Sequence, residues 1–139
     1  MKNKILTLSV LALAAGLAGC KKDNTDSAFN GSWEKRVSFG FTGRIEYPEG
    51  NGTGFDFQGN RYTAFNSGIP GQAGTFRLAP DWFYQSNEKG WRIVFDKELT
   101  QKRFYELRGD TLSIFDDRSV SDGGMTQYVR RESLFVQPE

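Results

Sequence analysis

Apolar and polar side chains alternate along this chain from Trp33 onward with a period of two residues. In the first such stretch the apolar parity holds Trp33, Val37, Phe39, Phe41, Ile45 and Tyr47, and it also holds Lys35. Side chains of a β-strand point alternately to opposite faces, so the pattern predicts strands with one buried face. Lys35 must then reach out at a rim or find a polar partner inside. Nowhere does a helical period continue for three turns, and we therefore expect an all-β fold.

Two segments fifty residues apart, 55–65 and 105–115, repeat one strand, turn and strand pattern. Their centres are Gly59-Asn60 and Gly109-Asp110, which suit a type II′ hairpin turn with positive φ at its first central residue. Such turns fix the register. The expected cross-strand pairs are Phe57 with Tyr62, Phe55 with Ala64, Leu107 with Leu112 and Tyr105 with Ile114. Phe65, Phe104 and Phe115 fall on the opposite face, where the open end of a barrel or a neighbouring segment is expected to cover them.

Further short strands are expected at 74–78, 82–84, 91–95 and 125–131. The segments 79–81 and 86–90 are predicted to be turns, and 116–124 to be a loop. The total is eight or nine strands joined by short connections. An antiparallel meander of that size exposes its edges unless it closes, so an up-and-down barrel is favoured and a β-sandwich is the alternative.

The first twenty residues follow a different pattern. Lys2 and Lys4 precede an apolar run over 5–17, which ends in Leu17-Ala18-Gly19-Cys20. This is the order of a secretory leader, and the run is shorter than the roughly 20 residues that a membrane span needs. The last four residues resemble the bacterial lipobox, which implies cleavage before Cys20 and a diacylglycerol on its thiol. We expect a signal peptide over 1–19, a flexible tether over 20–28 and one folded domain over 29–139.

The composition limits the available chemistry. Histidine is absent and Cys20 is the only cysteine, so the sequence offers neither an internal disulfide nor the usual general base. We expect a protein that is not an enzyme and needs no cofactor. The net charge of +1 becomes −1 when two lysines leave with the leader, which gives no field to attract nucleic acid.

Two groups of acidic residues could in principle provide catalysis or bind a metal ion. Asp56 and Glu106 would form a carboxylate pair if the two hairpins adjoined. Asp116, Asp117 and Asp122 bring hard oxygen ligands for calcium into one loop, without the spacing of a known calcium loop. Solvated surface carboxylates are the simpler interpretation of both groupings.

Aromatic residues are abundant, with twelve Phe, five Tyr and three Trp. An eight-stranded barrel is just wide enough either to fill with side chains or to hold one small ligand. The candidates for core or pocket lining are Trp33, Lys35, Phe39, Phe57, Tyr62, Phe76, Trp91, Tyr105 and Tyr128. Tyrosine hydroxyls and Lys35 would orient a guest.

Gly31-Ser32-Trp33 at the start of the folded body and a basic residue on the final strand, Arg130 or Arg131, resemble the small lipocalin-like lipoproteins of Bacteroidota. The segment 105–112 is also similar to a late hairpin of those proteins, and the resemblance spans most of 29–131. In lipocalins an Arg or Lys of the last strand packs over the Trp of the Gly-x-Trp motif, which implies a closing pair of Trp33 and Arg130. The resemblance further implies a lipocalin-like barrel with an open mouth.

Two functions remain open from the sequence. The first is a lipid-anchored protein of the bacterial envelope, most simply of the outer membrane, that binds a small apolar or amphipathic ligand. The second is a non-catalytic accessory subunit that docks on an envelope protein through the face carrying Phe65, Phe104 and Phe115. The membrane leaflet, periplasmic or surface-exposed, stays open as well.

Overall fold

The computed structural model describes residues 27–83, 88–96, 102–116 and 124–135. Within these ranges the chain forms one 3₁₀ turn, η1, and nine strands. The elements are η1 (Ser27–Phe29), β1 (Gly31–Gly40), β2 (Gly43–Glu46), β3 (Gly54–Gln58), β4 (Arg61–Asn66), β5 (Ile69–Trp82), β6 (Lys89–Phe95), β7 (Arg103–Arg108), β8 (Thr111–Asp116) and β9 (Met125–Arg131).

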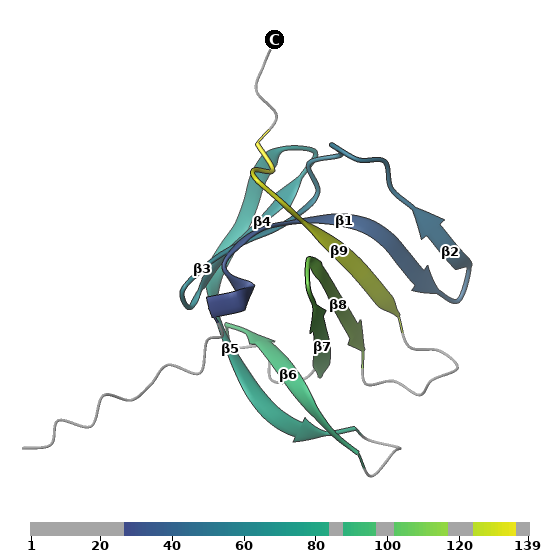
Figure 1. Cartoon of the computed structure of the whole chain (residues 1–139), viewed down its shortest axis with the longest axis vertical. Coiled ribbons are helices and arrows are strands. Elements are labelled where there is room, and N and C mark those ends of the chain that lie inside the picture. The colour runs from purple at the N-terminus through teal and green to yellow at the C-terminus, as the bar shows by residue number, and fades with distance from the viewer. Residues whose placement is uncertain (1–26, 84–87, 97–101, 117–123, 136–139) are drawn as a thin grey trace, which may run out of the picture.

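The strands wrap into a closed antiparallel barrel. From β3 to β9 each strand pairs with the next, β1 pairs with β3, and β9 returns to pair with β1. Eight strands thus close the barrel, while β2 extends it as an extra strand beside the second half of β1 (Figure 1). The expected up-and-down meander, closed into a small lipocalin-like barrel, is confirmed.

Both predicted hairpin turns are present. Gly59 and Gly109 have φ of 61° and 57°, whereas Asn60 and Asp110 do not have positive φ, as a type II′ turn requires. The register follows from these turns, and the four expected pairs, Phe57–Tyr62, Phe55–Ala64, Leu107–Leu112 and Tyr105–Ile114, all form.

The prediction of a turn at 79–81 is wrong, because β5 continues through it and pairs with β6. Pro80 lies opposite Trp91 in this stretch. The pairing of β4 with β5 ends at Arg61 and Thr75, so the second half of β5 has a strand neighbour on one side only. A strand edge tolerates a residue that lacks an N–H group, which explains how proline is accommodated there.

The prediction that Phe39 faces inward is also wrong. The register of β1 against β9 slips at Arg36, since Lys35 pairs with Tyr128 but Val37 pairs with Gln127. A one-residue bulge of this kind reverses the faces of all later side chains. Ser38 therefore takes the inward position, and Phe39 lies on the outer face opposite Met125. Beyond it, Phe41 belongs to the turn between β1 and β2 and is 95% exposed.

The barrel has two different ends. We call the end with η1 and the turns at Gly59 and Gly109 the closed end, because Phe29 of η1 packs into it. The Phe29 ring lies 5.4 Å from Phe57, 5.9 Å from Phe76 and 4.7 Å from Tyr105, measured between centroids. The opposite end, where β6, β8 and β1 finish, is the open end.

The three outer-face phenylalanines are covered by neighbouring segments, as expected. Phe83 stacks on Phe104 at 4.0 Å and lies 5.8 Å from Phe115, while Phe135 meets Phe65 at 5.0 Å. Phe65 and Phe104 are consequently buried. They are therefore not available as the exposed docking face that the sequence suggested for an accessory subunit.

Candidate functional site

Two adjoining cavities of about 270 and 410 Å³ lie at the open end of the barrel. Both are lined by Phe55, Phe95 and Arg103, and we call them together the cup. The smaller cavity is also lined by Ile114, Asp116, Gly124, Thr126 and Tyr128, and the larger by Tyr62, Ala64, Gln72 and Asp96.

Aromatic rings form the apolar part of the cup. Phe55 stacks on Phe95 with centroids 5.5 Å apart and touches Tyr128 at 5.5 Å. Phe57 lies next to both stacked rings, at 5.6 and 6.4 Å, and belongs to the packed core. A guest would therefore occupy the open end alone, because aromatic side chains fill the rest of the barrel.

Charged and hydroxyl groups occupy the wall. The Arg103 guanidinium lies 5.7 Å from the Phe95 ring, and Arg103 is the register partner of Asp116. Asp96 accepts hydrogen bonds from the Thr75 N–H at 2.6 Å and the Tyr62 hydroxyl at 2.8 Å. These two bonds, that of Thr75 foremost, lower the pKa of Asp96, which is thus ionised at neutral pH.

Tyr128 contributes a further hydroxyl to the wall. Burial raises the pKa of its phenol to about 12, so the hydroxyl stays protonated and able to donate a hydrogen bond. Beside it on the same face lies Lys35, its register partner, with Nζ 4.3 Å from the centroid of the Tyr47 ring. Lys35 thus contacts a polar side chain, Tyr47, as one of the two expected arrangements requires.

Tyr47 links Lys35 to Ser38. Its hydroxyl lies 3.3 Å from Ser38 Oγ, and hydrogen bonds with Ser38 and then Lys35 lower the pKa of Tyr47. Ser38 is the register partner of Thr126, which lines the smaller cavity. The β1 side of the cup is therefore rich in hydroxyl groups.

The closed end contains the predicted pair of Trp33 and Arg130. The Arg130 guanidinium carbon lies 4.2 Å from the Trp33 ring centroid, and the guanidinium donates to the carbonyls of Ala28 and Asn30 at 2.7 and 2.5 Å. Trp33 Nε1 donates to the Phe29 carbonyl at 2.7 Å. These bonds fasten η1 across the closed end.

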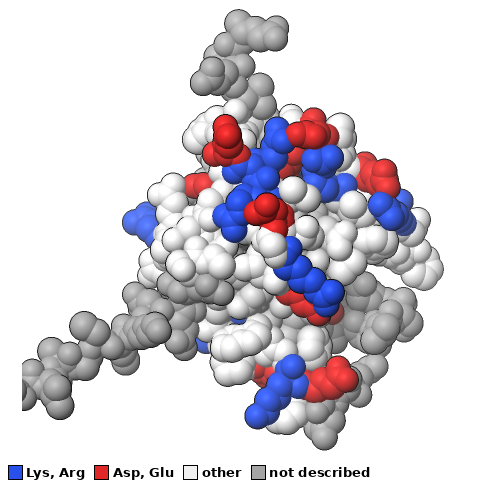
Figure 2. Space-filling view, in the orientation of Figure 1, with Lys and Arg blue, Asp and Glu red and all other residues white. Residues whose placement is uncertain are grey.

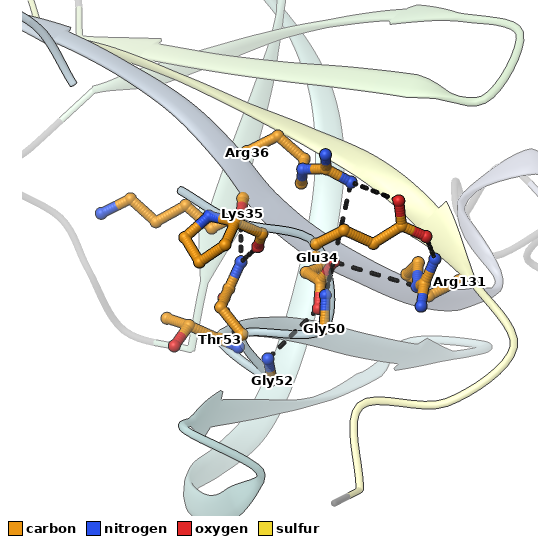
Figure 3. Close-up of polar contacts among 10 residues, drawn as sticks. Glu34, Lys35, Arg36, Gly50, Gly52, Thr53 and Arg131 are labelled. Atoms are coloured by element: carbon orange, nitrogen blue, oxygen red, sulfur yellow. Dashed lines mark hydrogen bonds and ion pairs between the residues drawn. The ribbon is translucent and has the colours of Figure 1, made fainter. Parts of the chain in front are cut away.

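A buried carboxylate that the alternation of residues does not predict lies on the outside of the barrel. Glu34 is 2% exposed and accepts hydrogen bonds from the backbone N–H groups of Gly50 and Gly52, both at 3.1 Å (Figure 3). Arg36 and Arg131 lie 3.9 and 3.8 Å from it, and both also pair with Glu49. We call these six residues the Glu34 network. Figure 2 shows basic and acidic side chains alternating over this part of β1 and β9.

The remaining predicted site residues are dispersed. Phe57, Tyr62 and Phe76 are buried in the core, whereas Trp91 is 53% exposed on β6. The carboxylate pair of Asp56 and Glu106, which the sequence disfavours, does not form, because β3–β4 and β7–β8 do not adjoin in the sheet. Asp56 instead accepts a hydrogen bond from Ser32 at 2.9 Å, and Glu106 pairs with Arg108 at 3.0 Å.

Some predictions fall on residues outside the described ranges. These are Cys20 with its leader and most of the loop considered for calcium. Among the residues that the structure does describe, three or more metal-ligating acids, cysteines or histidines nowhere come together. In the same residues no helix is long and apolar enough to cross a bilayer.

No known protein family, curated protein or solved structure matches this chain. The cup is then the feature of the molecule best suited to a function. It combines a concave shape, an apolar floor and a few polar groups, which are the usual properties of a site for a small molecule.

Proposed function

We propose that the protein is a lipid-anchored lipoprotein of the bacterial envelope whose lipocalin-like barrel binds a small amphipathic molecule in the cup. The observation that most supports binding is the stacked pair of Phe55 and Phe95, which lines the cup together with the adjacent Tyr128 and Arg103. The larger cavity, about 410 Å³, lies near the lower limit of ligand sites, roughly 300 to 1,000 Å³.

The lining favours an amphipathic guest over a purely apolar one. A hydrocarbon would displace water from Arg103 and Asp116 and offer neither a hydrogen bond in return, and loss of hydration by charged groups is costly. A molecule with a flat apolar face can lie on Phe55 and Phe95 while its polar edge meets the Tyr128 hydroxyl and the Arg103 guanidinium.

Blocking the cup tests the binding. Thr126→Phe places a ring in the smaller cavity, while Gln127→Phe places the same ring on the neighbouring residue, which faces outward with Ser113. Native mass spectrometry and calorimetry with a panel of amphiphiles should show one saturable site in the wild type and in Gln127→Phe. Thr126→Phe should bind about tenfold more weakly or worse. Equal affinities in the two variants, or no saturable binding by the wild type, would contradict the proposal.

The anchor is tested separately. The order of Lys2, Lys4, an apolar run and Leu17-Ala18-Gly19-Cys20 supports lipidation of the cysteine. Cys20→Ser should abolish labelling by a fatty-acid probe and remove the protein from the membrane fraction. Unchanged labelling would reject the anchor and leave the ligand test untouched.

A further inference from the structure

Two of the three tryptophans are exposed on one face of the β5–β6 hairpin. Trp82 and Trp91 are 49% and 53% exposed. The register places Trp82 opposite Lys89 and Trp91 opposite Pro80, so the four side chains share one face of the sheet. The Lys89 ammonium lies 5.0 Å from the Trp82 ring centroid. We call these four residues the hairpin patch.

The side chains of the hairpin patch lie on the face of the sheet that points into the barrel. At the hairpin patch the core no longer covers this face. Phe76 and Leu78, on the same face of β5, are buried in the core. The pairing of β6 with β7 reaches only to Trp91 opposite Tyr105, so the rest of the hairpin extends away from the barrel (Figure 1). Exposed aromatic rings grouped in this way mark a contact surface.

The hairpin patch lies at the end of the barrel where the chain enters. Tyr105, the register partner of Trp91, contacts the Phe29 ring of η1 at 4.7 Å. Trp33 and Arg130 hold η1 in place through its backbone carbonyls. Ser27 and the hairpin patch therefore keep a fixed relation to each other at the closed end.

We propose that the hairpin patch rests on the head-group region of the bilayer that holds acylated Cys20, a proposal that depends on the anchoring described above. The seven residue-to-residue steps from Cys20 to Ser27 span at most about 25 Å when fully extended. An anchored chain thus keeps the closed end beside the lipid. Tryptophan and lysine are the residues that favour this interface, since the indole is amphipathic and the ammonium meets lipid phosphate.

Asp81 does not oppose this contact. It is a neighbour of Trp82 in sequence but lies on the other face of β5, where Arg92 and Lys102 pair with it at 3.5 and 3.2 Å. Docking through the closed end also directs the cup away from the bilayer. The site would then take its guest from the aqueous compartment and not from the lipid phase.

Brominated lipids test the proposal, because bromine near the top of the acyl chains quenches tryptophans that lie at the membrane interface and not those in water or in the protein core. The acylated full-length mature protein is reconstituted into vesicles of phosphatidylethanolamine and phosphatidylglycerol with and without bromolipid. Trp33 is fully buried and serves as an internal reference. Bromolipid should quench most of the emission of Trp82 and Trp91, and should leave the Trp82→Ser/Trp91→Ser variant, which retains Trp33, unquenched.

A matched control moves a tryptophan to the other end. In the double-serine background, Phe41→Trp adds an exposed indole to the turn between β1 and β2, which should respond to aqueous iodide and not to bromolipid. Flotation of the vesicles reports the anchor independently of quenching.

Each outcome decides between the proposals. Wild-type protein that floats with the vesicles but is not quenched overturns docking and leaves the anchor standing. Protein that does not float overturns the anchor and docking together. Emission that shifts with cellohexaose but ignores bromolipid would assign the hairpin patch to a polysaccharide, and it would likewise overturn docking to the bilayer.

Discussion

Among the charged side chains that the structure describes on the outer face of the barrel, the buried carboxylate of Glu34 should be the most damaging one to remove. In Glu34→Ala the backbone N–H of Gly52, which is buried, loses its acceptor, at a cost of about 1 to 3 kcal/mol. The N–H of Gly50 is exposed and can turn to water. Arg36 and Arg131 are about one-third exposed and keep Glu49, so the lost ion pairs add at most about 1 kcal/mol.

The expected loss for Glu34→Ala is therefore about 1 to 4 kcal/mol in the free energy of unfolding. Glu34→Gln keeps one acceptor oxygen and should lose about half as much. The control is Glu49→Gln, because Glu49 is 61% exposed and should matter by less than about 1 kcal/mol. Urea unfolding followed by circular dichroism measures all three. The reasoning is refuted if Glu34→Ala unfolds at the wild-type midpoint, or if the Glu49 variant is as unstable as Glu34→Ala.

Gly59→Val and Gly109→Val should each lower the free energy of unfolding by about 1 to 3 kcal/mol in thermal melts, because a β-branched residue is forced to positive φ. No atom lies within 4 Å of the added Cβ at either position, so the cost comes from the backbone alone. A neutral result would mean that the turns differ from those described. Asp96→Asn should flatten the acid end of the stability profile. The carboxylate is stabilised by the Thr75 N–H, which lowers its pKa below the ordinary 3.8, so its contribution is present above about pH 4 and is lost as pH falls through the lowered value; equal profiles would count against this. Tyr128→Phe should flatten the alkaline end, since burial raises the pKa of Tyr128 from 10 to about 12 and its contribution is lost between these values; an absorbance titration in which every tyrosine ionises near 10 would disprove it.

The sequence predicts the local parts of this fold well because they depend on neighbouring residues. Alternation of apolar and polar positions is enough to indicate strands, and Gly59-Asn60 with Gly109-Asp110 is enough to fix two turns and their pairs. Closure of the meander follows from the need to protect its edges.

The errors arise where distant segments meet. The bulge at Arg36 depends on how β1 fits β9, and no local pattern marks it, so Phe39 was assigned to the wrong face. Proline favours a turn at residue 80 when the sequence is considered alone. β5 can hold Pro80 because the pairing of β4 with β5 ends before this residue, which no local pattern shows. Arg103 and Asp116 lie at strand ends. The alternation of apolar and polar residues gives no reason to expect charged side chains inside the barrel there.

The glycines before β3 were the available signal for the Glu34 network. Gly50 and Gly52 lie in a short segment that folds back over β1 and presents two N–H groups to a carboxylate. The alternation of residues places Glu34 on the solvent face, since burial of its side chain comes from a loop and not from the sheet.

Pairing of β1 with β9 joins groups as distant as Asn30 and Arg130, 100 residues apart. A nascent chain that appears N-terminus first must therefore leave one border of β1 unoccupied until β9 has been synthesised. Such late closure makes folding slow, because the pairing joins residues far apart in the sequence. It also makes loss of β9 severe, because a shortened chain would retain two bare strands ready to associate with other copies.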